Sequence, residues 1–153
     1  MEALAAAVEG LALAEWLRFS RWGYAAVNAL HILGIALLVG AIVPLDLRLL
    51  GLWRSVELAP LYRMLSRIAA AGLLLAIASG ALLFSVRATE YADGALFRAK
   101  MVLVMLGVAH ALALHCRATF PGGVSRARRR FAGAVSLLLW PLVLVCGRML
   151  GYV

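Results

Sequence analysis

The chain has 153 residues, of which 65% are hydrophobic and only 14% charged, and its formal net charge is +8. Soluble domains are nearer to about 45–50% apolar, so this composition excludes an ordinary soluble protein. The basic excess lies mostly in short connections between apolar runs, where it is a membrane-topology signal and can meet anionic lipid. We therefore predict a single-domain integral membrane protein with no nucleic-acid partner.

Residues 1–21 are rich in alanine and leucine and carry three glutamates. A signal peptide would begin with a basic region, whereas this segment is acidic. The pattern predicts an amphipathic helix that lies at the membrane interface. Ser20 is a candidate N-cap for the helix that follows.

Four apolar runs follow, each close to the length of about 20 residues that spans a bilayer. The predicted spans cover approximately residues 22–45, 64–87, 97–117 and 131–152. The fold class expected is therefore all-α, with residues 22–153 forming a four-helix transmembrane bundle. Pro60 suits the first turn of the second span, and Pro141 is expected to kink the fourth.

The charged residues predict which way the bundle faces. The connections after the first and third spans hold nine of the basic residues and only two acids, Asp46 and Glu57. The positive-inside rule places these arginine-rich connections in the cytoplasm and both termini outside, which is the periplasmic side of a bacterial inner membrane. Asp46 and Arg48 are expected at the cytoplasmic interface, where they could pair with each other.

Histidines inside the apolar runs are the candidate functional residues, because a titratable group there is expensive without a partner. We take Trp22 and Lys100 as the residues that mark the outer face and count about 1.5 Å per residue from them. His31 then lies roughly 13 Å from this face and His110 roughly 15 Å. Two histidines at one level on two helices could ligate a b-type haem from opposite faces. Lys100 and Arg148, nearer the outer face, could hold the haem propionates. His115 is the reserve for the second ligand.

Other interpretations of these residues remain open. His31 and His110 could each simply form a hydrogen bond across helices, with Asn28 or Ser79 as candidate partners. His115 could be an interfacial residue, and Arg148 could extend to the outer headgroups. Soft ligands for Cu(I) are also present; they are Met64, Met101, Met105, Met149, Cys116 and Cys146.

Four segments carry a family resemblance. They read AVNALHILGIALLVG, PLDLRLLG, FRAKMVLV and LLLW…GRMLGY. From Glu15 onward the chain resembles an uncharacterised family of bacterial four-helix inner-membrane proteins. It is more distantly similar to the haem-binding membrane protoporphyrinogen oxidase of bacteria and to the copper-resistance D membrane family.

The oxidase family has a histidine before a glycine in its first helix and an (F/H)xxK entry to its third. His31 and Lys100, within Phe97-Arg98-Ala99-Lys100, match those positions. The resemblance implies a haem or porphyrin site that uses His31. The DLRLLG segment and Arg148 depart from the oxidase pattern, so only the porphyrin site carries over and the reaction is left open.

These observations lead to three functional hypotheses. The first is a haem-b-binding membrane protein in electron transfer or porphyrin redox chemistry, with a redox partner or a second copy of itself. The second is a copper or small-solute permease. The third is a non-catalytic membrane subunit or assembly factor.

Overall fold

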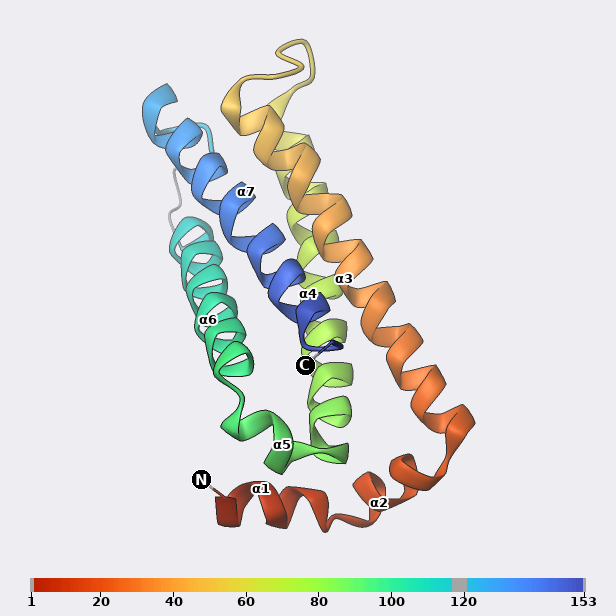
Figure 1. The fold of residues 1–153 in the computed structure, drawn as a ribbon. Coiled ribbons are helices and arrows are strands. Elements are labelled where there is room, and N and C mark those ends of the chain that lie inside the picture. The colour runs from red at the N-terminus through yellow and green to blue at the C-terminus, as the bar shows by residue number, and fades with distance from the viewer. Residues whose placement is uncertain (1, 117–120, 153) are drawn as a thin grey trace.

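The computed structural model describes residues 2–116 and 121–152. Within these residues it contains seven helices and no strand: α1 (Glu2–Glu9), α2 (Ala12–Phe19), α3 (Arg21–Leu50), α4 (Leu58–Val86), α5 (Ala88–Asp93), α6 (Ala95–His115) and α7 (Arg126–Met149). Helices α3, α4, α6 and α7 are long and apolar enough to cross a membrane. They lie alongside one another (Figure 1), which confirms the predicted all-α bundle of a multi-pass membrane protein.

Capping residues, rather than the limits of the charge-free runs, decide where the long helices begin and end. The Ser20 hydroxyl accepts a hydrogen bond from the Gly23 amide (3.1 Å), as predicted, and α3 follows. This helix continues to Leu50, five residues past the predicted end, because Gly51 terminates it in the left-handed conformation (φ 114°). Helix α7 begins at Arg126 rather than at residue 131, since Ser125 caps its first turn.

Three short helices run across one end of the bundle (Figure 1). The predicted single N-terminal helix is in fact two, α1 and α2, separated at Gly10 and Leu11. Helix α5, between α4 and α6, was not predicted at all. We call the end of the bundle that α1, α2 and α5 cross the N-terminal end. The opposite end, with the α3–α4 connection and the start of α7, is the arginine-rich end.

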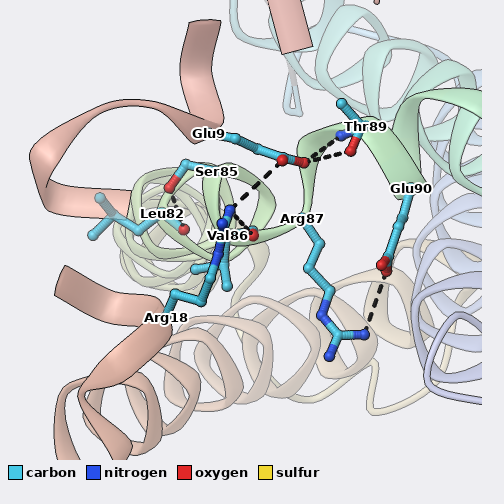
Figure 2. A network of polar contacts seen from close by, with 8 residues as sticks. All are labelled: Glu9, Arg18, Leu82, Ser85, Val86, Arg87, Thr89 and Glu90. Carbon is cyan, nitrogen blue, oxygen red and sulfur yellow. Dashed lines mark hydrogen bonds and ion pairs between the residues drawn. The ribbon is translucent and has the colours of Figure 1, made fainter. Parts of the chain in front are cut away.

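A polar network fixes the N-terminal helices to the bundle (Figure 2). The Glu9 carboxylate accepts hydrogen bonds from the Thr89 amide and hydroxyl, both at 2.7 Å, and pairs with Arg18 at 3.6 Å. Arg18 also donates to the Val86 carbonyl (2.9 Å). The Thr89 hydrogen bonds, more than the Arg18 charge, lower the pKa of Glu9. Helices α1 and α2 are therefore tied to the junction of α4 and α5.

Helices α3 and α4 form the most closely packed pair. A Cβ on Gly34 would lie 2.6 Å from the Ala76 backbone nitrogen, and one on Gly72 would lie 2.6 Å from the Leu38 nitrogen. Absent side chains thus bring the two backbones into direct contact, as in other membrane helix pairs with small residues at the interface. Helix α7 joins this pair through the buried Trp140.

Helix α6 is the most loosely held of the four. Gly107 is its only buried residue, packed against the Trp140 ring of α7. Side chains bridge α6 to α4 near both ends, where Phe84 stacks on Phe97 (5.1 Å between ring centroids) and Tyr62 lies beside His115 (5.7 Å). In the described chain, α6 makes no direct backbone contact with α3 or α4.

Candidate functional site

His31 lies half-buried on the face of α3 that packs against α4. Its Nδ1 is 2.9 Å from the Ala76 carbonyl oxygen and 3.2 Å from the Ser79 hydroxyl. The ring rests against Gly80, where a Cβ would come within 3.0 Å of the His31 Cε1. The close approach of α3 and α4 therefore creates the slot that the imidazole fills.

These contacts determine which ring nitrogen carries the proton. A carbonyl oxygen can only accept, so Nδ1 must be the donor to Ala76. The Ser79 hydroxyl donates to the Leu75 carbonyl, which leaves its oxygen free to accept from Nδ1 as well. In the neutral imidazole the lone pair is then on Nε2. Among the described residues no group forms a hydrogen bond with Nε2.

Lys100 lies in the same part of the bundle as His31. Its side chain is half-buried and reaches from α6 to α7, where the Nζ atom is 3.3 Å from the position of a Cβ on Gly147. It is close enough to His31 for the two groups to interact electrostatically, and it also interacts with Cys146. No carboxylate in the described residues pairs with it.

His110 lies far from His31, so the structure does not bring the predicted ligand pair together. The His110 Nε2 bonds to the Ala132 carbonyl of α7 (3.2 Å). The next residue, Gly133, packs against the backbone of Asp46. Asp46 follows His31 by fifteen residues on α3, which is roughly 22 Å at the helical rise. His110 is thus in the arginine-rich half of the bundle and His31 in the other half.

The remaining predicted residues lie at the two ends. His115 is exposed at the arginine-rich end, 3.4 Å from the Tyr62 hydroxyl, and so also far from His31. Arg148 is exposed at the N-terminal end, where it donates to the Tyr152 hydroxyl and lies over its ring, 4.6 Å from the centroid. Asn28 is exposed, and the partner of His31 is Ser79 rather than Asn28.

Asp46, on α3 in the arginine-rich half of the bundle, is buried rather than paired with Arg48 as predicted. It is only 3% exposed and lies against α7, with Ser136 as its polar neighbour. Its Oδ2 atom has no hydrogen-bond partner in the described structure. The predicted pairing with Arg48 does not occur, because Arg48 turns to the α3–α4 connection and donates to the Val56 carbonyl. The signal was available in the sequence, since Asp46 follows His31 at a spacing that returns to the inward side of α3.

The fold and the site define a multi-pass membrane protein of the four-helix class, with a histidine held between two of its spans. No family model matches the chain, and no curated protein and no solved structure is significantly similar to it.

Proposed function

We propose that this chain binds haem b through His31, as a membrane protein of electron transfer or porphyrin redox chemistry. The observation that carries the proposal is the state of the His31 ring. A ligating histidine characteristically donates one ring N–H to a carbonyl or carboxylate, which fixes its orientation and leaves the other nitrogen for the metal. The Nδ1 contact with Ala76 supplies this arrangement, and Nε2 has no competing partner among the described residues.

The other residues fit such a group only in part. Lys100 is a half-buried cation without a carboxylate partner among the described residues, so it can neutralise a propionate. Arg148 is engaged with Tyr152 near the same end. His110 does not fit as the second ligand, because its contact with Ala132 places it in the other half of the bundle. The proposal is therefore a haem held by one histidine of this chain. A bound haem would supply one-electron chemistry, with its potential set by the ligand and surroundings.

The proposal includes the orientation in the membrane. The arginine-rich end would face the cytoplasm of a bacterium, and the N-terminal end would face the periplasm. His31 and Lys100 would then lie in the periplasmic half of the bilayer. The resemblance to the haem-binding oxidase family at His31 and Lys100 supports the same site.

Absorption spectroscopy of the purified protein tests the proposal. Expression with added haem followed by purification in mild detergent should give a Soret band and an α band that sharpens on reduction with dithionite. His31→Gly should lose both bands, and added imidazole should restore them because it replaces the missing ligand. His110→Gly is the matched control and should keep the spectrum.

Two outcomes would overturn the proposal. One is a colourless wild-type protein after haem-replete expression, which would favour the hypothesis of a non-catalytic subunit. The other is a His31→Gly protein that keeps the wild-type spectrum.

A further inference from the structure

A cavity of about 220 Å³ lies at the arginine-rich end of the bundle, between the end of α3, the α3–α4 connection and the start of α7. This volume is below the range of about 300–1,000 Å³ that is typical of pockets for drug-sized ligands, and it suits a small ionic headgroup better. Five of its nine lining residues are arginines: Arg48, Arg54, Arg126, Arg129 and Arg130. The others are three leucines and Gly51.

The positive charge of this cavity is not balanced by nearby acids. None of the five arginines forms an ion pair within residues 2–116 and 121–152. Two acids are close in sequence, Asp46 and Glu57, and neither lines the cavity. Asp46 is buried against α7, and Glu57 is exposed before α4. The amino end of α7 adds the positive end of its helix dipole.

Two of the arginines are fixed in place by the connection itself. Arg48 donates from Nε to the Val56 carbonyl (2.9 Å), and Arg54 donates from Nε to the Gly51 carbonyl (3.1 Å). Each guanidinium has five N–H donors, so most of them remain free for a ligand. Arg129, on the opposite wall, is partly buried and forms no hydrogen bond through its side chain in the described structure. Arginine forks on two walls of one cavity are a geometry that recognises phosphate oxygens, and those of Arg48 and Arg54 are held in place.

We propose that this cavity is a binding site for an anion with two phosphate groups. Basic pockets between transmembrane helices at one membrane surface typically bind the phosphate-bearing headgroups of lipids such as cardiolipin. The leucines of the lining, among them Leu50 and Leu58, offer an apolar wall beside the charges. The same chemistry would recognise a soluble diphosphate, so the source of the phosphates is decided by experiment. This site is separate from His31 and does not depend on haem binding.

The arginine run at the start of α7 provides a matched control. Arg129 lines the cavity, whereas Arg128, the preceding residue, is exposed and does not. The two substitutions Arg129→Gln and Arg128→Gln remove the same charge from the same helical turn. A diffuse electrostatic attraction would lose the same affinity in both, whereas a built site loses it only with Arg129.

The test is a titration of the detergent-solubilised protein with cardiolipin, followed by native mass spectrometry, with phosphatidylcholine as the reference lipid. We expect saturable binding of cardiolipin and a loss of about tenfold or more in affinity for Arg129→Gln, since the charge-assisted hydrogen bonds of this guanidinium to the phosphate would be lost. Arg128→Gln should stay within about twofold of the wild type. Arg54→Gln, at an exposed position, should weaken binding without affecting the fold, which circular dichroism checks.

Inorganic pyrophosphate separates the two sources of phosphate. If pyrophosphate competes with cardiolipin, two phosphate groups are sufficient for binding at this site. If cardiolipin binds and pyrophosphate does not compete, the site requires the lipid. Both results support the proposal. Equal losses for Arg128→Gln and Arg129→Gln, or no saturable binding of either probe, would overturn it.

Discussion

The contact between α3 and α4 can be tested with two glycines on the same helix. At Gly34 a new Cβ would lie 2.6 Å from the Ala76 nitrogen and 2.9 Å from the Gly72 oxygen, which are backbone atoms that cannot move alone. At Gly40 a new Cβ would meet no atom within 4 Å. Gly34→Ala should therefore force α3 and α4 apart, whereas Gly40→Ala should fit without strain.

The comparison isolates the packing energy, because the helix-propensity gain of about 0.5–1 kcal/mol for glycine to alanine is common to both sites. Overpacking a tight contact costs about 1–3 kcal/mol. Gly34→Ala should thus be less stable than Gly40→Ala by that amount, or by about 2–12 °C in Tm for a chain of this size. Thermal unfolding in mild detergent, followed by far-ultraviolet circular dichroism, measures the difference. Equal midpoints for the two variants would refute the backbone-to-backbone contact.

Three further predictions concern charged groups. Because hydrogen bonds from Thr89 lower the pKa of Glu9, the docking of α1 should be complete above the ordinary glutamate pKa of about 4.3 and lost at more acidic pH. Hydrogen exchange of α1 should report this. Thr89→Val should weaken the docking of α1 already at neutral pH, because it removes the hydroxyl hydrogen bond to Glu9 and keeps that of the amide. Arg87→Ala should change stability by only about 0–1 kcal/mol, because its partner Glu90 is 66% exposed; a larger loss of Tm would contradict this. Asp46→Asn should raise Tm, since it removes a buried carboxylate with an unpartnered oxygen, and a lower Tm would count against that reasoning.

The bundle was predictable because its signal is the composition of long segments. Four apolar runs indicated four spans, and all four are present. The ends are less predictable, because a charged residue does not by itself end a helix. Helix α3 passes through Asp46 and Arg48 and ends only where Gly51 adopts a positive φ. The short helix α5 carries no signal that distinguishes it from a polar connection.

The candidate site was predictable residue by residue but not as an arrangement. His31 and Lys100 lie in the same half of the bundle, whereas His110 lies in the other half. The depth of His110 was counted on the assumption that Trp22 and Lys100 mark the same membrane face. Lys100 instead reaches inward to Gly147 and interacts with His31, so a residue ten positions further along α6 lies much deeper. The depth of a residue in the membrane depends on the axial offset between the packed helices, and the sequence of one helix does not determine this offset.

The contacts of the His31 ring are compatible with both explanations for a histidine inside a membrane span. The hydrogen bonds across the helices use Nδ1 alone, which donates to the Ala76 carbonyl oxygen and to the Ser79 hydroxyl. The absent side chain at Gly80 makes room for the ring, so α4 accommodates the imidazole without disturbing its own helix. Ligand binding would use Nε2, on the other side of the ring. Structural anchoring and ligand binding are therefore compatible roles, because each uses a different nitrogen and the first fixes the orientation that the second requires.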